Sequence, residues 1–239
     1  MIIIPDTHGR DFWREPVAEY LGKEHIFFLG DYLDPYEYEG ISTSEALIRF
    51  IEIVELKREN PDGITLLLGN HDLHYMSGDL MGSRYDFTHA FLIKKIIVEN
   101  SALFELGHVL DDGDTKVLFT HAGLRKGWVM AHKEFFEKDS PANVAHTLNE
   151  MWTDAAWRPY LYRILSDIST SRCGYSAYGS PIWNDIEDMA DDPDEYPGWY
   201  QIFGHSQQES EPVIGEHIAC LDCRKAFRFI DNGVFEELL

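Results

Sequence analysis

Five short motifs combine carboxylate, imidazole or amide side chains with glycine, and each follows a short apolar run. In chain order the motifs are Asp6-x-His8, Gly30-Asp31-x-x-Asp34, Gly69-Asn70-His71-Asp72, His121-Ala122-Gly123 and Gly204-His205. Their oxygen and imidazole groups are ligands that divalent manganese, iron and zinc accept. We therefore predict a metal site whose ligands are Asp6, His8, Asp31, Asn70, His121 and His205.

The spacing within the motifs favours two metal ions. Asp6 and His8 are two residues apart, so on a strand they point to the same side and can hold one ion together. The two oxygens of Asp31 can bridge a pair of ions. Two ions about 3.5–4 Å apart suit phosphate-ester hydrolysis, because they lower the pKa of a shared water toward about 7 and bind the phosphate oxygens. Sharp turns that present the ligands are predicted at Gly30, Gly69 and Gly204.

The apolar runs before the motifs are predicted strands that alternate with helices. The predicted strands span residues 2–4, 25–29, 64–68, 116–120 and 200–203, and the predicted helices span 12–21, 44–59 and 88–99. This alternation favours βαβ units and a buried, largely parallel sheet. Because the carboxyl ends of such strands converge on one crevice, the five motifs would meet there. Residues 214–223 and 226–239 are predicted to form a closing hairpin or meander with its turn at Asp231-Asn232-Gly233.

Residues 124–199 are rich in tryptophan, tyrosine and helical patterning. Since the chain has no repeat and no low-complexity linker, we expect one domain over residues 1–239 with this segment as a helical cap. The aromatic segment 152–162 is more typical of a cap core than of a base-stacking platform. The acidic run 184–196 is more typical of a solvated loop, although it could instead edge the site and select a basic substrate.

Composition narrows the possible partners and compartment. The chain has 239 residues, with 20 basic and 42 acidic side chains and a net charge of −22, which disfavours general nucleic-acid binding. No apolar run approaches the roughly 18 residues of a membrane span, and the N-terminus lacks a signal-peptide pattern. Three cysteines cannot form a disulfide framework, and Cys220 and Cys223 are interpreted as structural thiols. These features predict a cytoplasmic protein without membrane association.

The ordered series DTHG, GDYLD, GNHD, THAG and GHS resembles the calcineurin-like metallophosphoesterase superfamily. It is most similar to the branch of the phosphoprotein (Ser/Thr) phosphatases and the symmetrical diadenosine tetraphosphate hydrolases. The resemblance spans Asp6 to His205, and the stretch Ala219-Cys220-Leu221-Asp222 is similar to the family's ending. It implies an α/β fold with a central β-sandwich or mixed sheet layers flanked by helices. It also implies two divalent cations, with manganese preferred and iron or zinc as alternatives.

The resemblance further assigns a role to each candidate residue. His71 would be the general acid that protonates the leaving oxygen, and Asp34 would orient it through a hydrogen bond. Metal-bound hydroxide would attack the phosphorus in line, without a covalent phospho-enzyme. The first metal would be held by Asp6 and His8, Asp31 would bridge both metals, and the second site would be completed by Asn70, His121 and His205.

Two departures from the family pattern bear on the substrate. Ser/Thr phosphatases carry a phosphate-binding arginine directly after the second Asp of the GDxxD motif, where this chain has Pro35. Relatives outside this branch end in GHxH, where this chain has Gln207. The candidates for the missing phosphate contact are Arg10, Arg84, Arg125 and Arg172. We favour Arg172, because its region supplies a second phosphate-binding arginine in the family, although it could equally be a surface residue.

Three hypotheses for function remain. The preferred one is a metal-dependent phosphomonoesterase that acts on a phosphorylated protein or small molecule, similar to the Ser/Thr protein phosphatases. The alternative is a dinucleoside polyphosphate hydrolase, supported by the stretch GNHDLH, whose His74 could also point outward. A scaffold without catalysis is disfavoured, because all six ligands and His71 are present.

Overall fold

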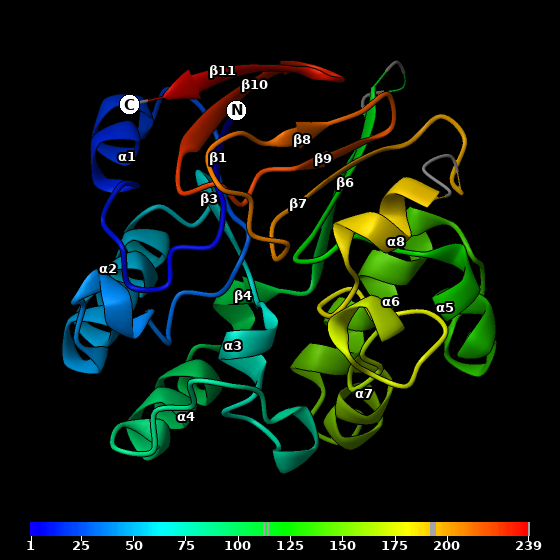
Figure 1. Cartoon of the computed structure of the whole chain (residues 1–239), viewed down its shortest axis with the longest axis horizontal. Coiled ribbons are helices and arrows are strands. Elements are labelled where there is room, and N and C mark those ends of the chain that lie inside the picture. Colours follow the sequence, from blue (N-terminus) through cyan, green and yellow to red (C-terminus); the bar gives the residue numbers. More distant parts are fainter. Residues whose placement is uncertain (112, 114, 192–194, 239) are drawn as a thin grey trace.

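The computed structural model describes residues 1–111, 113, 115–191 and 195–238, and in it two mixed β-sheets lie between groups of helices (Figure 1). The first sheet has the strand order β11-β10-β1-β2-β3-β4. Its strands β1 to β4 run parallel, whereas β10 is antiparallel to β1 and β11 to β10. The bounds are β1 Ile2–Ile4, β2 Ile26–Phe28, β3 Ile64–Leu67, β4 Phe104–Glu105, β10 Ala226–Asp231 and β11 Val234–Leu238.

The second sheet has the order β5-β6-β7-β9-β8. Strands β6, β7 and β9 are parallel, and β5 and β8 pair antiparallel at the two edges. The bounds are β5 Gly107–Asp111, β6 Lys116–Thr120, β7 Tyr200–Phe203, β8 Val213–Ile214 and β9 Ile218–Cys220. The mixed layers implied by the family resemblance are thus confirmed. The prediction of one largely parallel sheet holds only for the inner strands, because alternation along the chain does not reveal antiparallel strands added at the edges.

Helices cover the outer faces of both sheets. The α-helices are α1 Arg14–Tyr20, α2 Thr43–Glu59, α3 Asn70–Leu73, α4 Ala90–Glu99, α5 Lys126–Ala131, α6 Pro141–Thr153, α7 Arg158–Leu165 and α8 Ile186–Asp191. Short 3-10 helices are η1 Glu37–Glu39, η2 Gly78–Leu80, η3 Ser101–Leu103, η4 Lys133–Phe135 and η5 Thr170–Arg172. Helix α2 begins at a capping box, in which the Ser42 hydroxyl accepts from the Glu45 amide and the Glu45 carboxylate accepts from the Ser42 amide. The predicted helices and inner strands are confirmed to within two residues at each end.

Alternate residues of the parallel strands lie in two different cores. Ile2 and Ile4 point toward the helices and belong to the larger hydrophobic cluster. Ile3 and Phe27 point the other way and belong to a second cluster between the sheets. There Phe27 stacks on Phe119 of the second sheet, with ring centroids 4.2 Å apart. Because both faces of these strands are buried, they appear in the sequence as continuous apolar runs rather than alternating ones.

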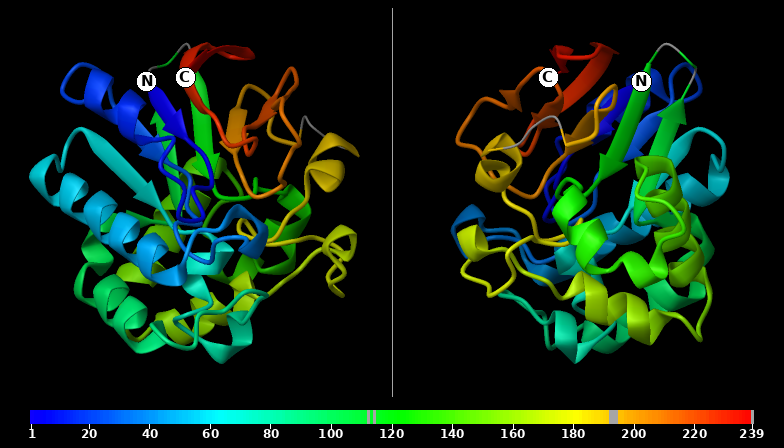
Figure 2. Two further views of the ribbon diagram at one scale, coloured as in Figure 1. Left: turned by 60° about the vertical axis from the view of Figure 1, so that its left-hand side comes forward. Right: turned by 90° about the vertical axis from the view of Figure 1, so that its right-hand side faces the viewer.

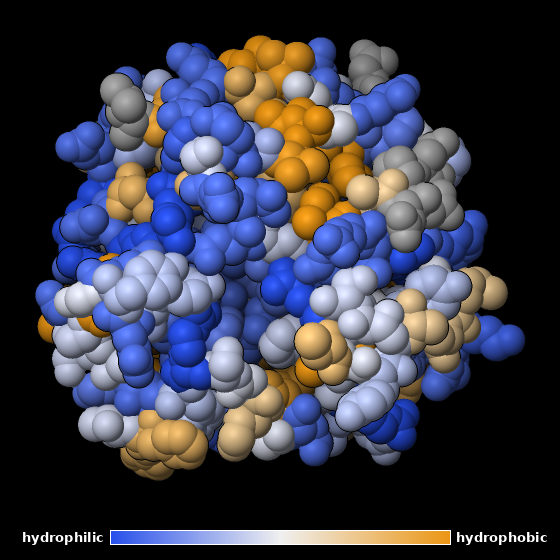
Figure 3. Space-filling view, in the orientation of Figure 1, coloured by the Kyte–Doolittle hydropathy of each residue, from blue (hydrophilic) through white to orange (hydrophobic). Residues whose placement is uncertain are grey.

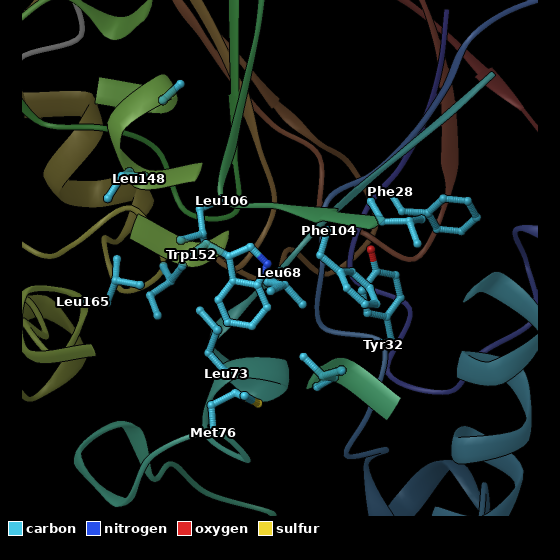
Figure 4. Close-up of a cluster of buried hydrophobic side chains, with 14 of the residues drawn as sticks. Phe28, Tyr32, Leu68, Leu73, Met76, Phe104, Leu106, Leu148, Trp152 and Leu165 are labelled. Carbon is cyan, nitrogen blue, oxygen red and sulfur yellow. The ribbon is translucent and has the colours of Figure 1, made fainter. Parts of the chain in front are cut away.

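The helical segment 124–199 shares the larger core with the first sheet. Figure 4 shows Leu148, Trp152 and Leu165 of this segment beside Leu68 and Phe104, and all five belong to one cluster. The side chain of Trp152 is fully buried, and its indole donates a 2.9 Å hydrogen bond to the Ser101 carbonyl. Figure 2 shows the yellow-green helices of this segment on the side of the sheets away from the chain termini.

The last strands form two hairpins in two different sheets. β10 and β11 pair in the first sheet, with Asp231 opposite Val234, so the predicted turn at residues 231–233 is confirmed. β8 and β9 pair at the edge of the second sheet. A single meander through both regions was therefore a wrong expectation, because apolar periodicity identifies strands but not their partners. Residue 239 lies outside the described residues, and among those described no helix combines the length and apolar character of a membrane span.

Candidate active site

All six predicted metal ligands lie together at the carboxyl ends of β1, β2, β3, β6 and β7. Their side chains form two groups that share Asp31, one with Asp6 and His8 and the other with His121 and His205. Within each group the ligand atoms lie within 4.8 Å of one another. Asn70 joins the second group, with its Oδ1 atom 3.0 Å from His121 Nε2. All six residues are buried, and Figure 3 shows a hydrophilic hollow in the middle of the face where the strand ends meet.

Backbone carbonyls orient two of the histidines. Nδ1 of His8 lies 2.8 Å from the Leu33 carbonyl, and Nδ1 of His121 lies 2.8 Å from the Leu29 carbonyl. Since a carbonyl only accepts, each Nδ1 carries a hydrogen and the lone pair of the neutral ring is on Nε2. Both Nε2 atoms face the same oxygen of Asp31, at 3.6 Å from His8 and 3.5 Å from His121. This is the arrangement by which proteins orient histidines for metal binding.

Around His121, atoms with lone pairs face one another. Its Nε2 atom lies 3.0 Å from Asn70 Oδ1 and 3.2 Å from His205 Nδ1, in addition to the Asp31 oxygen. Burial disfavours a charged imidazole here, but the negative charges of Asp31 and Asp6 prevail and raise the pKa of His121 to about 10. The site therefore attracts positive charge, and its nitrogen and oxygen donors fit divalent cations.

The charges of the other ligands follow from burial and from their neighbours. Burial, with the negative charge of Asp31, raises the pKa of Asp6 to about 7. Burial opposes ionisation of Asp31 as well, but His121 and His71 hold its pKa well below the ordinary value. Burial lowers the pKa of His8 to about 3 and that of His205 well below normal, so both imidazoles are neutral at pH 7 and can bind a cation.

In the turns that present the ligands, three of the ligand residues themselves have a strained backbone. His8, Asp31 and His205 have φ angles of 43°, 52° and 65°, in the left-handed region that non-glycine residues rarely adopt. Of the three glycines predicted to make these turns, only Gly30 has such a φ, of 102°. Gly69 and Gly204 serve close approach instead. A Cβ atom on Gly69 would overlap the Asp31 carboxylate, and one on Gly204 would overlap that of Asp6.

His71 and Asp34 form the predicted pair. Nδ1 of His71 lies 2.8 Å from Asp34 Oδ2, and the His71 amide donates to Asp31 Oδ1 at 2.8 Å. Asp34 also contacts His74, whose Nε2 atom is 2.7 Å away, and accepts from the Tyr75 hydroxyl. Although burial opposes ionisation, the hydrogen bonds from His71 and His74 lower the pKa of Asp34. His74 is buried and does not point outward, because α3 is a single turn that ends against this cluster.

Asp72 links two of the loops, a role that sequence analysis did not assign. Its carboxylate accepts from the amides of Asp31 at 2.7 Å, Tyr32 at 3.0 Å and Gly69 at 2.9 Å. Burial, with the nearby charge of Asp31, raises its pKa to about 8. Three amide donors on one carboxylate hold the loops after β2 and β3 together. A carboxylate directly after His71 was the available signal, but two of its three partners, Asp31 and Tyr32, lie about 40 residues away in the sequence.

The four candidate arginines have different surroundings. Arg10 pairs with Glu39, Arg125 with Glu195 and Arg172 with Asp185, at 2.9, 3.3 and 2.6 Å. Arg172 also donates to the carbonyl of His205 at 3.0 Å, so it reaches the edge of the site. Arg84 contacts the site directly, with its Nη2 atom 3.1 Å from His71 Nε2 and 3.4 Å from His8 Nε2.

These pairs also correct the interpretation of the acidic run 184–196 as a solvated loop. Asp185 and Glu195 are largely buried against Arg172 and Arg125 and neutralise them. Residues 192–194 of the run lie outside the described residues. The run appears solvated in the sequence because its basic partners lie elsewhere in the chain.

Comparisons with known proteins agree with this site. The family model for calcineurin-like phosphoesterases matches residues 1–208, which include every candidate from Asp6 to His205. Among solved structures, the chain is similar to a cold-active protein-tyrosine phosphatase of a psychrophilic Shewanella species, with 15% identity, a TM-score of 0.55 and coverage of 100% of this chain and 80% of that one. It is also similar to a protein serine/threonine phosphatase of Saccharomyces cerevisiae, with 12% identity, a TM-score of 0.53 and coverage of 99% and 78%. No curated protein sequence matches.

At these identities the solved structures support the fold, and the family match supports the chemistry. The two ligand groups that share Asp31 are the feature a metal-dependent esterase requires. The chain therefore belongs to the calcineurin-like phosphoesterase family and is a metal-dependent hydrolytic enzyme that acts on phosphate esters.

Proposed function

We propose that this enzyme hydrolyses phosphomonoesters with two divalent cations, and that His71 is its general acid. The observation that carries the proposal is Asp31, which is shared by two ligand groups and also accepts from the His71 amide at 2.8 Å. The proposed acid is thereby tied to the residue that would bridge the metals. A general acid beside the metals is what an ester with a poor leaving group needs.

Asp6 and His8 would hold the first cation, Asp31 would bridge, and Asn70, His121 and His205 would hold the second. Manganese is the cation we favour, with iron or zinc as alternatives, because oxygen and imidazole donors accept all three. Bound at these residues, the cations would activate water and neutralise charge on the phosphate.

The chain's own groups would manage the proton. Nδ1 of His71 donates to Asp34, so Nε2 is the atom directed toward His8 and the metal ligands. A proton on Nε2 would pass to the leaving oxygen. Asp34 would stabilise the imidazolium before that transfer, and its contacts with His74 and Tyr75 would keep it in place.

The small number of unpaired arginines near the site favours a monoester substrate over a dinucleoside polyphosphate. The dinucleoside polyphosphate stays the alternative substrate because of the GNHDLH stretch. A substrate with four phosphates needs several available cationic groups, whereas Arg10, Arg125 and Arg172 each pair with a carboxylate. We retain Arg172 as a proposed contact to phosphate. Its Nε and Nη2 atoms are engaged by Asp185, His205 and Ser206, so Nη1 would make that contact.

The setting of the site completes the proposal. Residues 1–239 would form one domain in which residues 124–199 cap the site, which the shared core of Leu68 and Trp152 supports. The three free cysteines support a reducing, cytoplasmic compartment. The net charge of −22 supports a phosphorylated protein or small molecule, and not a nucleic acid, as the substrate.

The proposal is tested by hydrolysis of p-nitrophenyl phosphate, bis-p-nitrophenyl phosphate and diadenosine tetraphosphate after chelation and after manganese is restored. Manganese-dependent hydrolysis of the monoester above the other two supports it. Faster cleavage of the dinucleotide would favour the alternative. No hydrolysis of any of the three, with metals bound, would contradict a general phosphomonoesterase.

A further inference from the structure

We propose that Arg84 binds the substrate phosphate and replaces the arginine that Ser/Thr phosphatases carry where this chain has Pro35. This inference rests on the proposed function and deepens it. Arg84 lies in the loop between η2 and α4, far in sequence from the GDxxD motif. Its backbone has a φ of 58°, in the same uncommon region as the ligands His8 and Asp31.

The guanidinium lies between the two groups that a bound phosphate must reach. Its Nη2 atom is 3.1 Å from Nε2 of His71, the proposed acid, and 3.4 Å from Nε2 of His8, a proposed metal ligand. A phosphoryl group in hydrolysis has one oxygen at the metals and its leaving oxygen at the acid. A cation beside both atoms is therefore within reach of the remaining phosphate oxygens.

Arg84 is short of partners. Within the described part of the chain it forms no ion pair with a carboxylate, and its Nε atom is buried without a hydrogen-bond partner. A buried donor that is left unpaired destabilises the folded chain. The guanidinium would also repel metal cations held by His8. An anion between Arg84 and the metals removes both costs, and phosphate accepts two parallel N–H bonds from one guanidinium.

Tyr36 holds the guanidinium in this position. The Arg84 Cζ atom lies 3.6 Å from the centroid of the Tyr36 ring, which is a cation–π contact. The same ring packs edge-on against His8, with centroids 5.3 Å apart. Tyr36 directly follows Pro35, so the segment that lacks the arginine of the Ser/Thr phosphatases supplies an aromatic surface for an arginine from another loop.

The test compares Arg84→Gly and Arg84→Lys with Arg163→Met in the manganese-loaded enzyme. Glycine suits a φ of 58°, so Arg84→Gly removes the guanidinium without adding backbone strain. Arg163 is a matched control, because it also lies over aromatic rings, those of Phe135 and Tyr160, but on α7. The readouts are KM and kcat for p-nitrophenyl phosphate, inhibition by inorganic phosphate, phosphate binding by calorimetry and metal content.

We expect Arg84→Gly to raise KM and the phosphate inhibition constant at least tenfold while two metal ions per chain are retained. For Arg84→Lys, both constants should lie between those of Arg84→Gly and the parent enzyme. Added guanidinium should partly restore phosphate binding to Arg84→Gly, and Arg163→Met should have the constants of the parent enzyme. Unchanged phosphate binding in Arg84→Gly, or loss of metal from it, would overturn the assignment. If the parent enzyme itself neither hydrolyses the monoester nor binds phosphate, the proposed function fails instead.

Discussion

Arg172 and Arg84 both approach the candidate site, and they differ in the groups around them. Arg172 comes from the helical segment 124–199, pairs with Asp185 at 2.6 Å and donates to the His205 carbonyl at 3.0 Å. Arg84 comes from the loop before α4, lies over Tyr36 and contacts ring nitrogens of His71 and His8. An arginine paired with a carboxylate mainly fixes its surroundings, whereas an arginine without a carboxylate partner keeps its charge for a ligand. The distance of an arginine from the site is therefore a weaker guide to phosphate binding than the absence of a carboxylate that neutralises it.

The largest expected effect comes from Asp31→Asn, which removes the charge shared by both ligand groups. We expect metal content to fall below two ions per chain and kcat/KM for p-nitrophenyl phosphate to fall more than about 100-fold, since even groups that only support metal ligands are worth 10- to 100-fold. Metal analysis and steady-state kinetics measure this. Asp139→Asn, at an ion pair with Lys126, is the control. A variant that keeps two ions would refute the bridging role of Asp31. A variant that loses the ions yet binds phosphate would show that the arginines alone are enough for phosphate binding.

His71→Asn distinguishes proton donation by His71 from phosphate binding by Arg84. Two metal ions should remain, and kcat on an alkyl phosphate should fall about 100-fold or more, because the leaving alkoxide receives no proton. The loss should be smaller on p-nitrophenyl phosphate, whose leaving group needs less help. Inhibition by inorganic phosphate should change little, since Arg84 remains. An unchanged kcat on the alkyl phosphate would rule out His71 as the acid.

Arg172→Met should have a smaller effect than Arg84→Gly. Because Asp185 already neutralises Arg172, we expect KM for p-nitrophenyl phosphate to rise about threefold and Tm to fall slightly, as for an ion pair worth about 1 kcal/mol or less. Kinetics and thermal unfolding on both variants make the comparison. A larger rise in KM for Arg172→Met than for Arg84→Gly would reverse the order of the two arginines.

The smallest effect concerns pH and stability without metal. The raised pKa values of Asp6, about 7, and His121, about 10, mean that the folded chain holds protons that the unfolded chain has released. Their contribution to stability is complete at low pH and is lost as pH rises through 7 and then 10. The lowered pKa of His8, about 3, reduces the stability of the folded chain only below about pH 6.5, where the unfolded histidine binds a proton.

In chelated protein, Tm should therefore fall by several degrees between pH 6.5 and pH 9. Manganese should raise Tm more at pH 9 than at pH 6.5, because it replaces protons that the ligands must release. Thermal unfolding across this range, with and without manganese, measures the effect. A flat profile for the chelated protein would show that Asp6 and His121 do not hold these protons.

The sequence by itself determined the inner strands, the long helices and the six candidate ligands. Strands such as β1 and β2 are buried on both faces, so they are visible as apolar runs. Ligands such as Asp6 and His205 directly follow such runs, and parallel strands end at a common edge, so their convergence follows from local pattern.

Only the tertiary structure decided which other groups join the site. Arg84 lies outside the five motifs, and the GNHDLH stretch does not fix where His74 points. The positions of both side chains depend on how a loop and a single helical turn pack against Tyr36 and Asp34. The carboxylate that neutralises Arg172 and the second sheet that receives β8 and β9 are likewise set by contacts between distant segments. Periodicity reports which face of an element is buried, whereas the partner on that face is selected by packing and charge in three dimensions.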